Sequence, residues 1–228
     1  MLKADPAMSA AKFDEYARHY GALHDQNLSA SGEPHEYFAA YKRACLERLG
    51  APTDEPLLDY GCGIGNVTRA LAEAFAEVHG YDPSRESLQI AAEQVPAATL
   101  HGDLDAVPDA YFASVVISGV LHHVPRPERV GVLERVRGKL RPGGRVFVFE
   151  HNPLNPATLR AVATCPFDDD ADLLWPWQAK KLVAEAGFAS VSLDFIVFFP
   201  RPLALLRPLE PHLGWLPAGA QMLVVGRR

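Results

Sequence analysis

The pattern of apolar and polar residues along the chain changes near Pro56. Between residues 10 and 49, apolar residues recur every three or four positions, which is the spacing of an amphipathic helix. Ser29, Gly32 and Pro34 interrupt this spacing, because glycine and proline break helices. The pattern therefore predicts two helices in the N-terminal part of the chain.

After Pro56, short runs that are almost wholly apolar alternate with helical stretches. The runs predict strands at 57–60, 77–81, 98–101, 112–118 and 145–150. The stretches between them predict helices at 67–75, 84–94 and 127–140. Strands that alternate with helices indicate βαβ units, and continuous apolar strands indicate a parallel sheet buried on both faces.

Proline is concentrated in the last third of the chain, where nine of the 19 prolines fall between Pro153 and Pro217. We therefore predict irregular segments at 152–177 and 200–217. A helix at 178–186 and a strand at 190–199 separate them, and a last strand is expected at 221–225.

Composition and charge narrow the class of protein. A hydrophobic fraction of 48% supports a sizeable core, and 22 Lys+Arg against 28 Asp+Glu disfavour a surface that binds nucleic acid. Cys45, Cys62 and Cys165 are widely spaced, which fits neither a disulfide framework nor a zinc motif and favours the cytoplasm. The chain starts without a signal-peptide pattern and has no apolar run of about 18 residues, so we expect no membrane association.

A glycine-rich turn, GCGIG, follows the first predicted strand, and Asp59 precedes it. Glycines permit a sharp turn and the close approach of a ligand to the backbone. The spacing G-x-G-x-G differs from the G-x-G-x-x-G of dinucleotide sites, which disfavours a nicotinamide-dependent oxidoreductase. A carboxylate before the turn would repel a pyrophosphate but accepts hydrogen bonds from an ammonium group. The expected ligand therefore carries a cationic amino group.

Two further acids follow the next two strands. Asp82 ends the second strand, where a carboxylate can accept the hydroxyls of a ribose. Asp103 follows the third strand, where a carboxylate can accept a hydrogen bond from an adenine amino group. Each acid alone is more often a turn or cap residue. Three acids at successive strand ends indicate one crevice for a nucleoside ligand.

Five segments resemble, in order and spacing, the motifs of class I S-adenosylmethionine-dependent methyltransferases, in their small-molecule branch: LLDYGCGIGNVTRAL, GYDPS, GDLDAVP, ASVVISGVLHHV and LRPGGRVFVFE. The resemblance implies an α/β fold with a Rossmann-like, mostly parallel sheet of seven strands, helices on both faces and an antiparallel C-terminal hairpin. It also implies a single domain over 1–228. Its expected parts are a helical N-terminal extension or lid (1–50), a cofactor-binding core (55–151) and irregular insertions near the acceptor pocket (152–177 and 200–217).

The cofactor that the resemblance implies is S-adenosylmethionine, with S-adenosylhomocysteine as the product. The residues expected to bind it are Asp59, Gly61, Gly63, Gly65, Asp82, Pro83, Asp103, Leu104 and Ser118. Tyr16 and Tyr20 resemble tyrosines that many members place over the cofactor from an N-terminal helix. Packing of that helix onto the core is an equally open interpretation of these two tyrosines.

Three histidines are candidate catalytic residues. His122 and His123 follow the fourth strand, and His151 ends the fifth, at the edge where the acceptor is expected. An imidazole has a pKa suited to removing a proton from an acceptor hydroxyl. A structural or cofactor-positioning role remains open for the His122–His123 pair. The acid run at 168–172 is expected to be a solvated face or a cluster at a helix N-terminus, and no metal is predicted.

The predicted function is methyl transfer from S-adenosylmethionine to an oxygen or nitrogen of a small-molecule acceptor. The segment at 150–174 resembles bacterial methyltransferases associated with polysaccharide or secondary-metabolite genes. The alternative is a non-catalytic or regulatory protein that retains the cofactor-binding fold. The sequence leaves the oligomeric state open.

Overall fold

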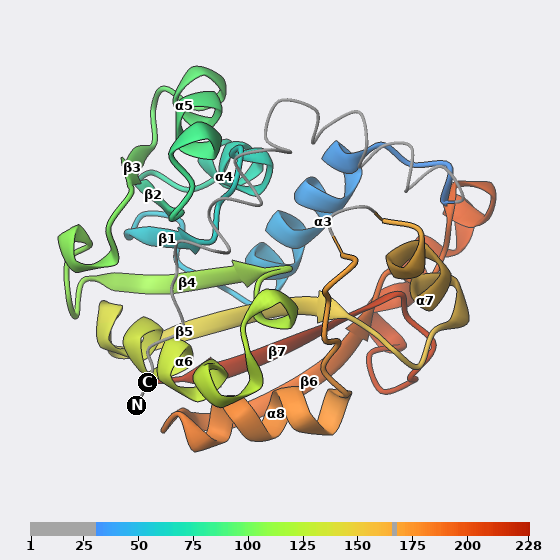
Figure 1. The fold of residues 1–228 in the computed structure, drawn as a ribbon. Helices are drawn as coiled ribbons and strands as arrows, with labels where there is room; N and C mark the ends of the chain where they lie inside the picture. Colours follow the sequence, from blue (N-terminus) through green and yellow to red (C-terminus); the bar gives the residue numbers. More distant parts are fainter. Residues whose placement is uncertain (1–30, 166–167) are drawn as a thin grey trace.

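Seven strands form one sheet in the computed structural model, which describes residues 31–165 and 168–228 (Figure 1). The strands are β1 (Leu57–Tyr60), β2 (Val78–Tyr81), β3 (Thr99–His101), β4 (Phe112–Ser118), β5 (Leu140–His151), β6 (Ala189–Ile196) and β7 (Gln221–Arg227). Their order in the sheet is β3-β2-β1-β4-β5-β7-β6. Only β7 runs antiparallel to its neighbours, β5 and β6. The predicted sheet, mostly parallel with antiparallel pairing at the C-terminal end, is confirmed.

Helices cover both faces of this sheet (Figure 1). The α-helices of the described residues are α3 (His35–Arg48), α4 (Asn66–Ala72), α5 (Arg85–Gln94), α6 (Arg129–Lys139), α7 (Pro156–Ala163) and α8 (Pro176–Glu185). Apolar residues of α3 and α4 belong to one buried cluster, and those of α6 and α8 belong to another. None of these helices is long and apolar enough to cross a membrane.

The central strands explain why their apolar runs are continuous. Along β5, Val146 and Val148 belong to the cluster beneath α6 and α8, whereas Phe147 and Phe149 belong to the cluster beneath α3 and α4. Successive side chains of a strand point to opposite faces, so a sheet covered on both faces needs an apolar residue at every position. All four side chains are buried.

Helix α3 confirms the second of the two helices predicted before Pro56. It begins directly after Pro34. Proline has no backbone N–H to donate, so it is tolerated at the start of a helix but not in its interior. The first predicted helix, with Tyr16 and Tyr20, lies outside the described residues.

The two proline-rich segments contain more helix than expected. Asn155 caps α7 inside the segment at 152–177, because its Oδ1 accepts hydrogen bonds from the amides of Ala157 (2.9 Å) and Thr158 (3.2 Å). Pro156 then occupies the first turn, where its missing amide hydrogen costs nothing. The Asn-Pro pair is therefore a helix start here. The segment at 200–217 likewise contains a 3₁₀ helix, Arg201–His212.

Asn152 joins the end of β5 to the loop before β7. Its side chain is fully buried, and its Nδ2 donates to the carbonyl oxygens of Gly219 (2.7 Å) and Pro217 (3.3 Å). Its Oδ1 accepts from the amide of Leu154 (3.1 Å). The side-chain amide thus forms hydrogen bonds with backbone groups on both sides, which gives Asn152 a structural role rather than one in binding an acceptor.

We predict that Asn152→Ala lowers the free energy of unfolding by about 1–3 kcal/mol, because it leaves buried carbonyl groups without their donor. Urea denaturation measures this loss. The exposed residue Lys180 on α8 provides the control, since Lys180→Ala should change stability by no more than about 0.5 kcal/mol. Equal stabilities of the two variants would refute the structural role of Asn152.

Candidate functional site

The carboxyl ends of β1, β2, β4 and β5 lie at one edge of the sheet, because these strands are parallel. The glycine turn leaves β1 at this edge. Gly61 has a positive φ of 75°, and a Cβ there would collide with the Val120 side chain, which follows β4. Gly63 also has a positive φ of 52°, but a Cβ there would meet nothing within 4 Å. Gly61 is therefore required for packing, whereas Gly63 borders open space among the described residues.

Asp82 ties the glycine turn to the end of β2. Its Oδ2 accepts a hydrogen bond from the Gly63 amide (2.8 Å), and its Oδ1 accepts one from the Ser84 amide (2.9 Å). The carboxylate is buried beside the turn, while the next residue, Pro83, is exposed. This geometry brings two of the predicted cofactor residues, Asp82 and Gly63, into direct contact.

Asp59 is buried beneath the turn and accepts a hydrogen bond from the Thr68 hydroxyl (2.7 Å). Burial raises the pKa of its carboxyl group to about 6, because water no longer stabilises the charged form. Gly65, which opens α4, packs against Ala91 of α5. Asp59 thus contacts α4 through Thr68, and Gly65 lets the start of α4 approach α5 closely.

Lys42 of α3 is a buried charged residue near Asp59 and Glu150 that the sequence interpretation did not single out. Its side chain is buried, and burial lowers the pKa of its ammonium group to about 8, opposed by Cys45, Asp59 and Glu150. The signal was present in the helix pattern, because Lys42 falls on the buried face of α3 four residues after Phe38. A lysine on an apolar face is a candidate for a specific electrostatic role.

Asp103, Leu104 and Ser118 complete the predicted cofactor set at the same edge. Asp103 is exposed and accepts a hydrogen bond from the Asp105 amide (2.9 Å) through Oδ1. Leu104 is buried in the core beneath α6. Ser118 is the last residue of β4, directly before Gly119, which has a φ of 67°.

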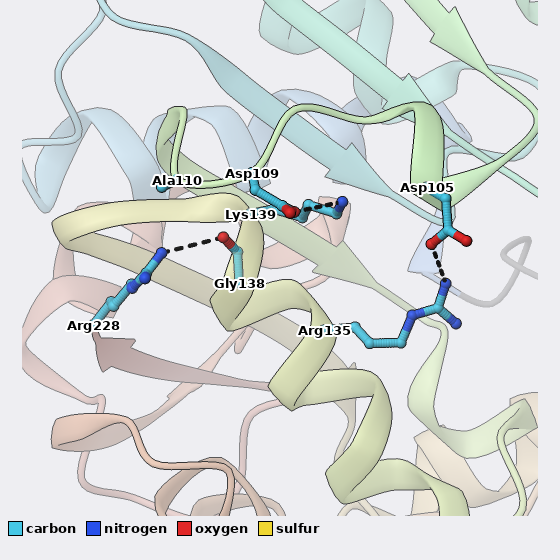
Figure 2. Close-up of a pocket in the computed structure, with 7 residues that line it drawn as sticks. All are labelled: Asp105, Asp109, Ala110, Arg135, Gly138, Lys139 and Arg228. Atoms are coloured by element: carbon cyan, nitrogen blue, oxygen red, sulfur yellow. Dashed lines mark hydrogen bonds and ion pairs between the residues drawn. The ribbon is translucent and has the colours of Figure 1, made fainter.

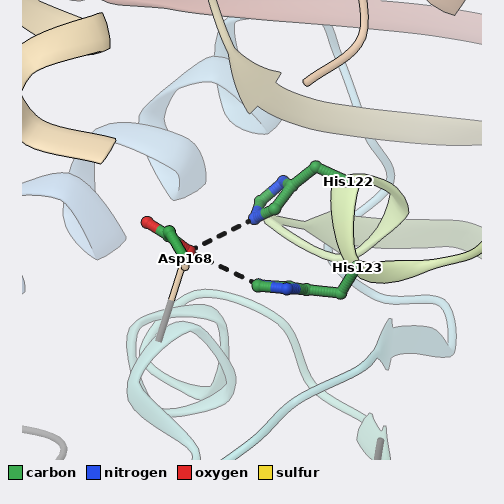
Figure 3. Close-up of side chains that lie close together, drawn as sticks. All are labelled: His122, His123 and Asp168. Atoms are coloured by element: carbon green, nitrogen blue, oxygen red, sulfur yellow. Dashed lines mark ion pairs between the residues drawn. The ribbon is translucent and has the colours of Figure 1, made fainter. Parts of the chain in front are cut away.

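Three histidines and one aspartate meet beyond the ends of β4 and β5. His122 Nδ1 lies 2.6 Å from Glu150 Oε2, and its Nε2 lies 3.6 Å from Asp168 Oδ1. His123 Nε2 lies 3.5 Å from the same Asp168 oxygen, and Figure 3 shows the two imidazoles side by side against this carboxylate. His151 Nε2 lies 4.0 Å from Asp168 Oδ2. The structure thus brings together all three predicted catalytic histidines.

The histidines differ in their exposure and charge. The side chains of His122, His123 and His151 are 2%, 11% and 29% exposed. Burial works to lower the pKa of His122, but the carboxylates of Glu150 and Asp168 outweigh it and raise the pKa to about 10. Burial, together with the neighbouring His122 cation, lowers the pKa of both His123 and His151 to about 4.

The acid run at 168–172 differs from the expected solvated face at its two ends. The Asp168 side chain is only 11% exposed and turns toward the histidines. Asp172 forms ion pairs with Arg126 and Arg129, and its amide donates to the His122 carbonyl oxygen (2.9 Å). These contacts hold the segment over the histidine cluster. No local sequence pattern indicates them.

A cavity of about 460 Å³ lies elsewhere, beside the C-terminal end of α6 (Figure 2). Four of its charged groups form ion pairs, since Lys139 Nζ lies 2.7 Å from Asp109 and Arg135 Nη2 lies 3.7 Å from Asp105, and Arg228 donates to the Gly138 carbonyl oxygen (3.1 Å). It contains none of the predicted site residues. We therefore place the candidate site at the carboxyl edge of the sheet.

The fold and this edge together define a class of protein. The seven-stranded sheet has an antiparallel β7, a glycine turn after β1 and an acid after β2, which is the arrangement in which Rossmann-like folds bind nucleoside cofactors. A family model described as "Methyltransferase domain" matches residues 57–144. Residues 57–144 thus match a methyltransferase domain, and this match together with the curated relatives supports a class I methyltransferase that uses S-adenosylmethionine as its cofactor.

The chain is similar in sequence to known proteins over much of its length. It is 32% identical over 149 residues to a dTDP-3-amino-3,6-dideoxy-alpha-D-glucopyranose N,N-dimethyltransferase of Streptomyces fradiae. It is 34% identical over 152 residues to a demethylmenaquinone methyltransferase of Beutenbergia cavernae. These alignments cover 64% and 65% of this chain, and the chain spans 58% and 60% of the two relatives.

One solved structure covers nearly the whole chain. It is a methyltransferase from Thermotoga maritima, described as a possible histamine N-methyltransferase. It superimposes with a TM-score of 0.69 over 95% of this chain and 98% of its own, at 19% identity. This similarity supports the fold.

The buried ammonium group of Lys42 predicts a pH-dependent stability. Because its pKa is about 8 in the folded protein and 10.5 without burial, the folded state loses this proton first, and stability rises with pH between these values. Relative to Lys42→Met, the wild type should gain on the order of 2–3 kcal/mol in unfolding free energy between pH 7.5 and 10. Chemical denaturation at both pH values measures it. If the unfolding free energies of the two proteins differ by the same amount at both pH values, the assigned burial of the Lys42 charge is wrong.

The open space at Gly63 predicts a selective loss of cofactor binding. Gly63→Ala and Gly50→Ala should each lose about 1 kcal/mol of stability, because both positions have positive φ and neither has a neighbour within 4 Å of a Cβ. Gly50 follows α3 and lies outside the predicted cofactor set, so it is a matched control. Calorimetric titration with S-adenosylhomocysteine should show at least about tenfold weaker binding for Gly63→Ala only. Unchanged affinity of Gly63→Ala for S-adenosylhomocysteine would show that the ligand does not contact this turn.

Proposed function

We propose that this protein transfers a methyl group from S-adenosylmethionine to an oxygen or nitrogen of a small-molecule acceptor and releases S-adenosylhomocysteine. The observation that carries the proposal is the position of the histidine cluster. His122, His123 and His151 follow β4 and β5 at the same sheet edge as the glycine turn after β1. A methyl donor and a proton acceptor at one edge are what the transfer requires.

The cofactor is proposed to lie along this edge in an extended arrangement. The turn of Gly61, Gly63 and Gly65 surrounds its methionine part, with Asp59 below it to balance the ammonium group. Asp82, next to Pro83, accepts the ribose hydroxyls, and the exposed Asp103 with the backbone of Leu104 accepts the adenine. Ser118, at the end of β4, is placed beside the sulfonium.

The protein contributes mainly by positioning the acceptor, because a sulfonium is already a good leaving group. His151 is proposed to receive the acceptor proton, since its side chain is the most exposed of the three histidines and its pKa of about 4 leaves it unprotonated at neutral pH. His122 is held between Glu150 and Asp168 and therefore positions the cluster. We assign His123 neither role over the other; its Nε2 lies against Asp168.

The acceptor class is proposed from charge and from the relatives. A net charge of −6 favours a small molecule over nucleic acid. The S. fradiae relative is named for an N,N-dimethyl transfer to a nucleotide-linked amino sugar, which supports an amine acceptor and a place in polysaccharide or secondary-metabolite synthesis. All three cysteines are buried and free, which fits the expected cytoplasmic location.

The test is the formation of S-adenosylhomocysteine, measured by mass spectrometry, from S-adenosylmethionine and a panel of nucleotide-linked amino sugars, phenols and amines. We expect one acceptor class to give turnover. His151→Gln should lower that turnover by about 100-fold, the usual contribution of a general base. His212→Gln, at an exposed histidine of the 3₁₀ helix Arg201–His212, is the control and should keep full turnover.

Two results would contradict the proposal at different points. Absence of S-adenosylmethionine binding in calorimetry would reject the cofactor assignment. Full turnover in His151→Gln would reject the role of His151 while leaving methyl transfer in place.

A further inference from the structure

His122, His123 and Asp168 form a set of metal-ligand type, which the sequence interpretation did not predict. One ligand atom of each residue lies within 4.8 Å of the others (Figure 3). We propose that these three residues bind a divalent transition-metal ion, and that its open coordination positions hold the acceptor. The second part rests on the proposed methyl transfer, and the first part stands without it.

The distances within the set fit an ion between the three side chains. Both imidazole Nε2 atoms face the same carboxylate oxygen, Asp168 Oδ1, at 3.5 and 3.6 Å. These separations are longer than a strong hydrogen bond. They match two ligands that each bond to one ion at about 2.0–2.2 Å, since such ligands lie roughly 3–3.5 Å apart. The ligand atoms all lie within 4.8 Å of one another, so the two imidazoles move toward each other where their separation exceeds this range.

Each histidine is also oriented for coordination by a carboxylate on its other nitrogen. His122 Nδ1 lies 2.6 Å from Glu150 Oε2, and His123 Nδ1 lies 3.5 Å from Asp170 Oδ1. A metal-bound histidine commonly donates its second ring N–H to a carboxylate, which fixes the tautomer and aims the free nitrogen at the ion. Glu150 is held in turn by the Leu121 amide (2.8 Å). His122 therefore shows this arrangement with a short hydrogen bond, and His123 shows it only as a longer ion-pair contact.

The backbone holds Asp168 in place before any ion binds. The Asp168 amide donates to the Cys165 carbonyl (3.1 Å), and the Asp168 carbonyl accepts from the Ala171 amide (3.0 Å). Arg129, itself buried, donates to the Asp172 carbonyl (2.8 Å) and to the Val124 carbonyl (2.9 Å), which ties this segment to the turn that carries the histidines. The ligand set is thus preorganised across two segments.

Charge favours a cation at this position. Glu150 and Asp168 are both largely withdrawn from water, and their ion pairs among the described residues are all with histidines. Two carboxylates in a low-dielectric site need positive charge nearby. The His122 cation supplies this charge in the metal-free protein, and a divalent ion that replaces its Nε2 proton supplies more of it at the point to which both histidines and Asp168 already turn.

The donor set indicates the type of ion and its use. Two imidazoles and one carboxylate suit Zn²⁺ or Fe²⁺, and three protein ligands leave positions open for a substrate. A hydroxyl or amine bound there becomes more acidic. The hydroxyl or amine of the acceptor gives its proton to His151. The acceptor atom then forms a bond to the methyl carbon, and the bond from that carbon to sulfur breaks with its electron pair left on sulfur. The products are the methylated acceptor, neutral S-adenosylhomocysteine and protonated His151.

The test is metal binding by the full-length protein, measured without any methyl donor. Protein freed of metal with a chelator is titrated with Zn²⁺ by calorimetry and with Co²⁺ by visible absorption, which reports the ligand geometry. We expect one equivalent of bound ion. Asp168→Asn and His123→Gln should each weaken binding by at least about tenfold. Circular dichroism and S-adenosylhomocysteine binding verify that the variants are folded.

Asp169→Asn is the matched control, because Asp169 is an exposed acid of the same run. It should bind Zn²⁺ as the wild type does. No stoichiometric binding by the wild type, or equal binding by folded Asp168→Asn, overturns the site. Methyl transfer that continues unchanged in metal-free protein overturns the acceptor role of the ion while leaving the proposed function intact. Metal binding without methyl transfer to any acceptor would support the metal site and reject the proposed function.

Discussion

The candidate site depends on the parallel pairing of β4 with β5. This pairing brings the ends of both strands to one edge, so that His122 and Glu150, 28 residues apart in the chain, share a hydrogen bond of 2.6 Å. The pairing of β1 with β4 adds the glycine turn to the same edge. The sizes of the side chains on the two faces fix the register of these strands, because a shift by one residue would move Phe147 and Phe149 into the cluster that the smaller Val146 and Val148 fill. Core packing therefore determines where the polar groups meet.

A second consequence of this packing is that charged groups are concentrated away from water. Lys42, Asp59, Asp82 and Glu150 are all buried at or near the carboxyl edge. In a medium of low dielectric constant, charges act on one another and on a ligand more strongly than they do in water. A sulfonium cofactor with an ammonium and a carboxylate group is a ligand whose charges such an edge can complement. The same burial makes the edge costly to maintain, which the surrounding hydrogen bonds offset.

Much of this architecture could be predicted from the sequence, and the limits have physical causes. Strand β4 covers the predicted residues 112–118, since a continuous apolar run between turns is a local signal. The glycine turn and Asp82 are also local. The inward position of Asp168 is different, because it depends on contacts of Asp172 with Arg126 and Arg129, more than 40 residues away. The capping of α7 by Asn155 was local but was hidden by the prolines around it.

The most direct test of the account is a crystal structure of the full chain with S-adenosylhomocysteine. We predict that the adenosine lies between Asp82 and Asp103, that the amino acid part follows the turn at Gly63, and that the sulfur faces the space between Ser118 and the histidine cluster. A ligand bound in the cavity between Asp105 and Arg228 would contradict the account. So would a sulfur directed away from His122, His123 and His151.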